Sequence, residues 1–321
     1  MKVSILILMF LVNLSLAMNP GTASAAFLRL SVDARAVGMG EGVSAYCRNI
    51  SSLYYNPAGL AEMGKYDFLF MHNQWLVGMY HEYGAVGYNA GKMGGFGMSF
   101  NYWGSGTIQG IDERGDTIRI NGSPYTFSAS AWSVGAGYGY AIANLSLGAA
   151  LKYVAEKNES LSDGAVGLDL GARFHPPLKG VSLAFSVSNA GTGIVLDEVN
   201  GVSFPLPLMV RFGAAYRLKA AGITSDIVIS NSDNVGIGLG GEYWLAEICA
   251  LRLGYKSGSN VDGLSGLRAG LGVKYKALSI DYAFAPYGSL GMAHRISLGY
   301  GLDPAPRPTR VKRPAPPVRK K

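Results

Sequence analysis

The sequence contains little charge and almost no cysteine. Only 15% of its 321 residues are Asp, Glu, Lys or Arg, and two are Cys, against 45 Gly and 19 Tyr. This composition favours a single repetitive β architecture over an ordinary soluble domain. Cys47 and Cys249 lie far apart and show no spacing signature. In an oxidising compartment they could form a disulfide, or they could be two separate buried apolar residues.

Motifs for catalysis, metals and cofactors are also missing. The four histidines lack ligand spacing, "DERGD" at 112–116 is typical of a loop tip, and no nucleophile elbow or triad spacing occurs. A dinucleotide loop must open a helix, whereas "GIGLGG" at 236–241 is followed by "EYWLAEI", which continues a strand. Alternate glycines there fit a crowded inner wall. We therefore expect neither an enzyme nor a cofactor or metal site.

Long apolar runs are absent except at the start of the chain. Lys2, an apolar run over 3–16 and the small residues 23–25 have the order of a secretory signal peptide, which gives 1–25 as the signal and cleavage after Ala25. A cut after Ala17 also satisfies the small-residue rule. No later segment has eighteen consecutive apolar residues, so we expect no transmembrane helix after processing.

The net charge of +7 comes from one end of the sequence. Residues 303–321 contain seven basic residues and one acidic residue, and Lys2 belongs to the signal, so the intervening chain is close to neutral. The basic balance therefore does not predict a nucleic-acid-binding fold. The proline-rich segment 303–321 is expected to be a disordered periplasmic tail. It either binds an acidic periplasmic partner or an anionic envelope polymer, or is passively solvated.

Most of the chain alternates with period two. In "LSIDYAFAPYGSLGMAHRISLGYGL", residues 278–302, Ile296 and Leu298 face one way while Arg295 and Ser297 face the other. The pattern predicts fourteen strands, at 65–72, 76–89, 93–105, 126–140, 143–156, 162–175, 180–189, 208–218, 222–230, 234–245, 248–257, 264–275, 277–285 and 292–302. Most exceed the usual strand length in soluble sheets and suit a tilted crossing of a bilayer.

Connections are expected to alternate in length, with tight turns after even strands and long loops near 106–125 and 190–207 after odd strands. Bacterial outer-membrane barrels place their short turns in the periplasm. The sequence therefore predicts an all-β, fourteen-stranded antiparallel transmembrane β-barrel over 65–302, in the cell outer membrane of a Gram-negative type, with both termini periplasmic. The alternative is a secreted β-sandwich with a wet charged face.

Basic residues gather on the inward face of these strands, because a Lys or Arg facing lipid near the midplane costs about 2–4 kcal/mol. The candidate inward-facing basic residues are Arg173, Arg211, Arg252, Arg268, Lys274 and Arg295. A positive lumen could favour carboxylate ligands or anions. Alternatively, acidic groups, water and pairs within the inner wall satisfy these charges.

Residues 26–64 do not alternate. Asn56 followed by Pro57 is a helix start signal, and Gly59 allows close approach of neighbouring chain. The segment is too polar and broken to span lipid, so it needs shelter by protein. We expect an N-terminal hatch or plug inside the barrel, with a periplasmic segment packed beneath the barrel as the alternative.

Several of these stretches resemble one family of outer-membrane proteins. They are "AAFLRLSVDARAVGMGEG", "SSLYYNPAGLAEM", "FPLPLMVRFGAAYRL", "GGEYWLAEICALRLGYKSG" and the "DYAFAPYGSLGMAHRISLGY" ending. Together they are similar to the PorV/PorQ family, and "NPAGL" is shared more loosely with the long-chain fatty-acid transporter (FadL) group. The resemblance implies a FadL-like fourteen-stranded barrel with 26–64 as its hatch. The tail after residue 302 departs from the family pattern.

Two functions follow as expectations. The resemblance to PorV/PorQ implies a barrel that binds or shuttles secreted proteins, as in type nine secretion, through the long outer loops 106–125 and 190–207. The alternative is a FadL-type transporter of small hydrophobic molecules. In both cases the outer-membrane lipid is a partner.

Overall fold

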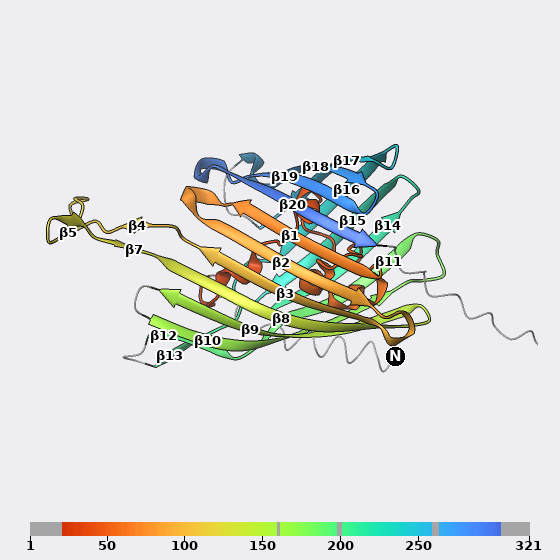
Figure 1. Ribbon diagram of the computed structural model, residues 1–321, viewed down its shortest axis with the longest axis horizontal. Coiled ribbons are helices and arrows are strands. Elements are labelled where there is room, and N and C mark those ends of the chain that lie inside the picture. Colours follow the sequence, from red (N-terminus) through yellow and green to blue (C-terminus); the bar gives the residue numbers. More distant parts are fainter. Residues whose placement is uncertain (1–20, 159–160, 198–200, 259–262, 303–321) are drawn as a thin grey trace, which may run out of the picture.

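A closed barrel of fourteen antiparallel strands is the main body of the molecule (Figure 1). The computed structural model describes residues 21–158, 161–197, 201–258 and 263–302. The signal-peptide core and the basic tail predicted from the sequence lie outside these residues. The barrel strands are β1 (Tyr66–Gln74), β2 (Tyr80–Asn89), β3 (Gly95–Gly104), β8 (Ala129–Ile142), β9 (Leu145–Asn158), β10 (Leu161–Phe174), β11 (Val181–Gly191), β14 (Met209–Arg217), β15 (Ala221–Ser230), β16 (Gly236–Leu245), β17 (Cys249–Lys256), β18 (Leu267–Tyr275), β19 (Leu278–Pro286) and β20 (Met292–Leu302).

Pairing between the first and last strands closes the barrel. β1 and β20 are antiparallel, with Gln74 opposite His294 and Phe68 opposite Tyr300. Closure removes the unpaired edge that an open sheet would leave. The fourteen-stranded antiparallel barrel predicted from the alternation is thus confirmed.

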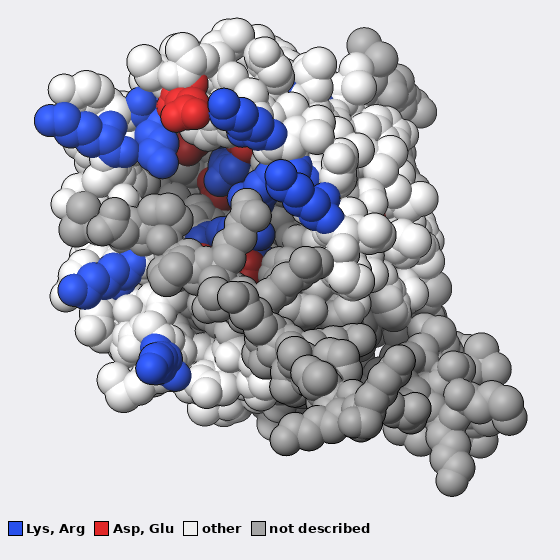
Figure 2. Space-filling view, turned by 90° about the vertical axis from the view of Figure 1, so that its right-hand side faces the viewer, with Lys and Arg blue, Asp and Glu red and all other residues white. Residues whose placement is uncertain are grey.

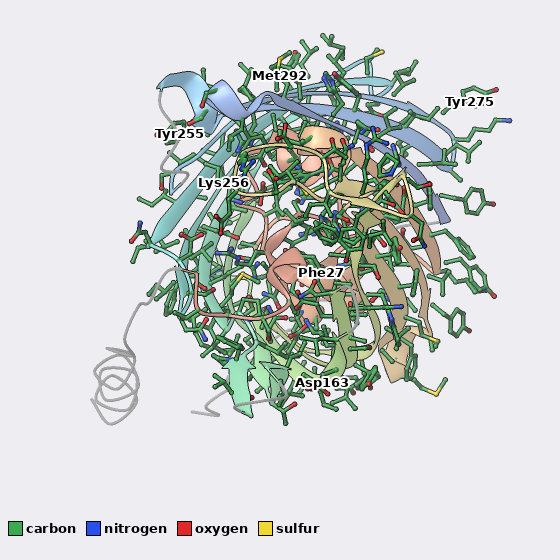
Figure 3. All side chains as sticks on the ribbon, turned by 90° about the vertical axis from the view of Figure 1, so that its left-hand side faces the viewer. Phe27, Asp163, Tyr255, Lys256, Tyr275 and Met292 are labelled. Carbon is green, nitrogen blue, oxygen red and sulfur yellow. The ribbon has the colours of Figure 1, made fainter. Side chains whose placement is uncertain are left out.

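The outer wall is apolar and the inner wall is polar. On β20, Ile296 and Leu298 are 51% and 50% exposed, whereas Arg295 and Ser297 are 1% and 0% exposed. Tyr275 projects away from the wall in Figure 3. An apolar exterior of this kind is typical of barrels that contact lipid. None of the helices in the described ranges is both long and apolar enough to span a membrane.

The expected alternation of connection lengths fails in two places: five residues join β1 to β2 and five join β2 to β3, and the order is reversed around β10. Between β9 and β10 only two residues intervene, although this connection follows an odd strand, and six residues join β10 to β11. The reason is that strand pairing continues to the end of the hairpin, where Asn158 pairs with Leu161 and also with Ala129 of β8. Residues that were expected to form a loop are therefore hydrogen-bonded parts of β9 and β10.

The two longest connections fold into hairpins. Between β3 and β8, the strands β4 (Ile108–Gln109), β5 (Arg119–Ile120), β6 (Ser123–Pro124) and β7 (Thr126–Phe127) form an arm that projects far beyond the barrel (Figure 1). Between β11 and β14, β12 (Gly193–Asp197) pairs with β13 (Val202–Pro205) and contacts β10. Both hairpins lie at the same end of the barrel, which we call the arm end.

The chain before β1 lies inside the barrel, and residues 21–64 are called the inner segment. It contains four short helices, η1 (Ala26–Arg29), α2 (Ala34–Gly38), α3 (Ser52–Tyr55) and η2 (Pro57–Glu62). α2 contacts β17 to β20, while η2 contacts β2, β3, β8, β9 and β10 on another part of the wall. Figure 1 shows these helices, in red and orange, enclosed by the strands.

The two cysteines do not pair. Cys47 is buried in the inner segment, whereas Cys249 is exposed at the start of β17. The disulfide considered from the sequence is therefore absent.

Candidate functional site

The inner segment fits because the inner wall is rich in glycine. A Cβ atom on Gly238 of β16 would lie 2.5 Å from the carbonyl oxygen of Gly40 and 2.8 Å from the nitrogen of Gly42. Gly40 itself has φ +65°, and a Cβ there would lie 2.6 Å from the carbonyl oxygen of Tyr255. The glycines of "GIGLGG" thus line a crowded lumen and let two backbones meet.

Asn56, Pro57 and Gly59 join the inner segment to β10. The helix expected after Asn56 is present as the 3₁₀ helix η2, and the Asn56 side chain accepts a hydrogen bond from the backbone nitrogen of Ala58 (3.1 Å). The Asn56 Nδ2 also donates to the carbonyl oxygen of Ala172 (3.1 Å). A Cβ on Gly59 would lie 3.0 Å from a guanidinium nitrogen of Arg173. Gly59 therefore permits the approach of that arginine.

Glu62, at the end of η2, forms an ionic contact between the inner segment and the wall. Its carboxylate lies 3.3 Å from Arg173, 2.8 Å from His175 and 3.4 Å from Arg48. Burial alone would raise the pKa of Glu62, but the positive charge of Arg173 and the hydrogen bond with His175 outweigh it and hold that pKa below its usual value. Glu62 is thus a charged hub, which we call the Glu62 latch.

Another ionic contact joins α2 to β16 and β17 and is called the Arg35 latch. Arg35 donates to Glu242 with a 2.7 Å contact, and Arg252 donates to the same carboxylate at 2.7 Å. Arg252 also lies 2.7 Å from Asp281 on β19. The Tyr46 hydroxyl donates to Glu242 (3.0 Å). Buried charges are tolerated when they are paired and hydrogen-bonded in this way.

Charged side chains and a buried apolar cluster together fill the barrel interior, and the cluster packs Ile50, Leu53 and Leu60 of the inner segment with Leu69, Met71 and Tyr83 of the wall. Figure 2 looks at the end opposite the arm and shows acidic and basic side chains together in the hollow. Each latch holds one carboxylate between an arginine of the inner segment and an arginine of the wall. Sequence reasoning found the wall arginines but missed Glu62 and Arg35, because alternation does not apply to the inner segment.

The remaining basic candidates lie in different surroundings. Arg211, Arg268 and Arg295 are buried on the inner face, at 5%, 2% and 1% exposure. Arg295 stacks on Trp75 at 5.3 Å, and its Nε and Nη1 have no hydrogen-bond partner among the described residues. Lys274, also expected to face inward, is exposed and lies near the end of β18.

A cavity of about 180 Å³ lies between the inner segment and the wall of β14 to β18. Arg211, Arg268 and Lys256 line it from the wall, and Glu41 and Tyr54 line it from the inner segment. It is near the arm end, because the connections after β15 and β17 contribute to its rim. In Figure 3, Lys256 lies on the inner side of the wall and its neighbour Tyr255 on the outer side. We call this space the upper cavity.

An apolar cluster lies beside the upper cavity at the arm end. It joins the inner segment to β8, β9, β10 and the β12–β13 hairpin. Its buried members are Ala25, Phe27, Leu28, Ala131, Val154, Ala165, Ile194 and Leu206, and Leu30 and Trp103 pack against it. Phe27 is seen near the centre of the barrel mouth in Figure 3. Further inside, beyond this apolar mouth, the barrel contains both the two latches and another buried apolar cluster.

No metal site is visible in the described ranges, where no three His, Cys, Asp or Glu side chains are grouped for one ion.

Comparison with known proteins gives the fold. No protein-family model and no curated protein matches the sequence. The structure is similar to the toluene transporter TbuX of Ralstonia pickettii, with a TM-score of 0.58 and 13% identity over 86% of this chain and 100% of that one. It is also similar to the toluene transporter TodX of P. putida (TM-score 0.59, 12% identity, 89% and 99% covered) and to a FadL homologue of Pseudomonas aeruginosa (0.56, 11%, 85% and 99%). The described chain therefore has the barrel fold of the FadL-type transporters.

Proposed function

We propose that this chain is an outer-membrane barrel that admits small hydrophobic molecules. The fold likeness to toluene transporters supports this function over the capture of secreted proteins. The apolar outer wall suits lipid, and the long strands suit a tilted crossing of a bilayer. With short turns facing the periplasm, the arm end is the outer face, as in the orientation expected from the sequence.

The apolar mouth is the observation on which the proposal rests. Phe27 and Leu28 of the inner segment pack on Ile194 and Leu206 of the β11–β14 connection, so two separate pieces of chain share one apolar contact. A small hydrophobic molecule can replace such a contact without exposing apolar surface to water. The mouth is therefore a place where an apolar solute can leave the outer face and reach the interior.

Passage beyond the mouth requires the inner segment to move. The segment occupies the interior and is held by the Glu62 and Arg35 latches, by Ser44 on Asp226 and by the Asn56 contacts. The segment also shares a buried apolar cluster with Leu69, Met71 and Tyr83 of the wall, so its displacement requires local opening of both the polar and the apolar contacts. The inner segment acts, in this proposal, as the hatch that limits the rate of passage.

Uptake of a hydrophobic dye tests this function. A naphthylamine dye that fluoresces in phospholipid is added to Gram-negative cells whose intact outer membrane excludes it. We expect expression of the chain to accelerate the fluorescence rise, and Phe27→Asp to remove the acceleration, because a charge in the mouth repels an apolar solute. Val77→Asp is the matched control, since Val77 is 88% exposed and outside the barrel wall. A rate equal to that of cells with empty vector would refute the proposal.

Capture of secreted proteins is a second candidate, favoured by the projecting arm. Ile111 and Ile120 of the arm are 63% and 55% exposed, which is unusual for a segment that reaches so far from the barrel. The PorV/PorQ resemblance implies the same use of the loop at 106–125. Removing 108–127 and analysing the proteins that co-purify from the native host tests it: loss of a specific secreted protein supports the role, and an unchanged set contradicts it.

A further inference from the structure

The upper cavity has more positive charge than its acidic groups neutralise. Arg29, Arg211, Lys256 and Arg268 line it, together with two carboxylates, Glu41 and Asp233. Formal charges therefore leave an excess of two positive charges. Arg211 and Arg268 are 5% and 2% exposed, so their charges are screened less than surface charges are.

Both carboxylates of the cavity already have cationic partners. Lys256 lies 2.7 Å from Glu41, and Arg29 lies 3.1 Å from Asp233. Burial alone would raise the pKa of Glu41, but Lys256 and the arginines beyond it lower that pKa below its usual value. Glu41 is thus ionised at neutral pH and is engaged with Lys256.

The other two cations of the cavity are not in direct contact with a carboxylate. Arg211 donates to the Ser188 hydroxyl (3.1 Å), and Arg268 donates to the carbonyl oxygens of Ser265 (2.5 Å), Leu267 (2.8 Å) and Pro286 (3.4 Å). Neither forms a salt bridge with a carboxylate in the described ranges. Arg268 is 2% exposed, and its Nε has no hydrogen-bond partner there. A buried guanidinium whose charge meets only hydroxyl and carbonyl oxygens is costly unless an anion or water also contacts it.

Aromatic rings lie next to both arginines. The Arg211 guanidinium is 5.7 Å from the Tyr54 ring centre, and the Arg268 guanidinium is 5.1 Å from that of Tyr287. Both rings line the upper cavity, as does Tyr55. The cavity thus combines cations that lack a counter-ion with flat apolar surfaces, and rings of this kind pack well against another ring.

We propose that the upper cavity binds small aromatic carboxylates, with the carboxylate held by Arg211 and Arg268 and the ring placed against Tyr54, Tyr55 and Tyr287. This inference rests on the proposed uptake function and names the class of molecule that the barrel selects. A guanidinium presents paired N–H groups that match the two oxygens of a carboxylate. Neutral hydrocarbons of the same size would leave both arginines without a counter-ion.

The volume of the cavity sets the size of this ligand. At about 180 Å³, it lies below the roughly 300 Å³ at which pockets for drug-sized ligands begin. A cavity of about 150 Å³ is enough to hold benzene. The upper cavity therefore has room for one ring with a short acidic group, and not for a long acyl chain.

Binding to the purified, detergent-solubilised full chain tests the inference, with benzoate and its neutral analogue benzamide as probes in equilibrium dialysis. We expect benzoate to bind at least about tenfold more tightly than benzamide, because charge-assisted hydrogen bonds are worth more than neutral ones. Arg211→Gln and Arg268→Gln should each weaken benzoate about tenfold and leave benzamide nearly unchanged. Arg114→Gln, which removes an exposed arginine from the arm, is the matched control.

The outcomes separate this inference from the proposed function. Equal binding of the two probes, no binding of benzoate, or unchanged benzoate affinity in Arg211→Gln would overturn it, even if dye uptake by cells is normal. Conversely, selective benzoate binding without accelerated dye uptake would support the cavity and refute the uptake function. Heat-dependent gel mobility shows whether each variant has a folded barrel. Arg268→Lys keeps the positive charge, so it should retain more benzoate affinity than Arg268→Gln if Arg268 contacts the carboxylate.

Discussion

Removing the carboxylate of Glu62 should loosen the inner segment by a predictable amount. In Glu62→Ala, the Arg173 guanidinium loses the carboxylate that it contacts, and the Arg173 side chain is 0% exposed. Breaking a buried ion pair by removing one partner costs about 3–5 kcal/mol. The barrel strands keep their own hydrogen bonds, so the destabilisation should appear as local opening of the inner segment.

Cys47 reports this opening directly. It is a buried thiol of the inner segment whose pKa is raised to about 11, chiefly by burial, so it reacts slowly with maleimides while the segment is in place. The assay uses a Cys249→Ala background, because Cys249 is exposed. If labelling follows local opening, Glu62→Ala should accelerate it on the order of a hundredfold or more.

Glu113→Ala is the matched control for Glu62→Ala. Glu113→Ala removes an exposed carboxylate from the arm and should leave the labelling rate within about twofold of the background, as surface charges contribute little. A Glu62→Ala rate that also stays within about twofold, with the barrel intact, would mean that the Glu62 latch does not hold the segment.

Further predictions concern pH, packing and processing. Because the folded-state pKa of Glu62 is lowered, the stability that Glu62 gives the inner segment is complete above the usual glutamate pKa of about 4.3 and is lost as the pH falls further. Hydrogen-exchange protection of α3 and η2, corrected for intrinsic rates, should therefore be constant from pH 7 to 5. A loss of protection already at pH 6 would contradict this. Gly40→Ala should destabilise the inner segment by about 1–3 kcal/mol or more, because Gly40 has a φ of +65° and a Cβ there would overlap Tyr255. Faster Cys47 labelling would report this change, whereas Gly84→Ala, which has open space around it, should leave the labelling rate unchanged. The intact mass of the purified chain should correspond to a start at Ala26, and a mass beginning at Met18 would favour the alternative cut after Ala17.

Much of the barrel could be predicted from the sequence, because a two-sided wall imposes a period of two. Arg268 and Arg295 alternate with large apolar residues, and the structure places both on the inner face. Lys274 shares that alternation, yet it is exposed, since alternation gives the face of a strand and not the distance from its end. The short turn expected between β8 and β9 is present, whereas the β9–β10 loop was overestimated because strand pairing continued.

The site could be predicted only in part. Asn56 and Pro57 indicated a helix start, and the structure has η2 there. The partners of the latches could not be found, because Arg35 and Glu242 are 207 positions apart and Glu62 and Arg173 are 111 apart. Such pairs depend on where the inner segment lies around the barrel, and an irregular segment has no periodic pattern that reports it. The upper cavity depends on the same placement.

Dye uptake by cells expressing Glu62→Ala tests the central claim most directly, namely that the inner segment limits the passage of small hydrophobic molecules through this barrel. The account predicts a rate above that of the wild type, which in turn exceeds the empty vector, at equal amounts of folded barrel. A Glu62→Ala rate equal to the wild type, in protein whose Cys47 labelling shows a loosened segment, would contradict it.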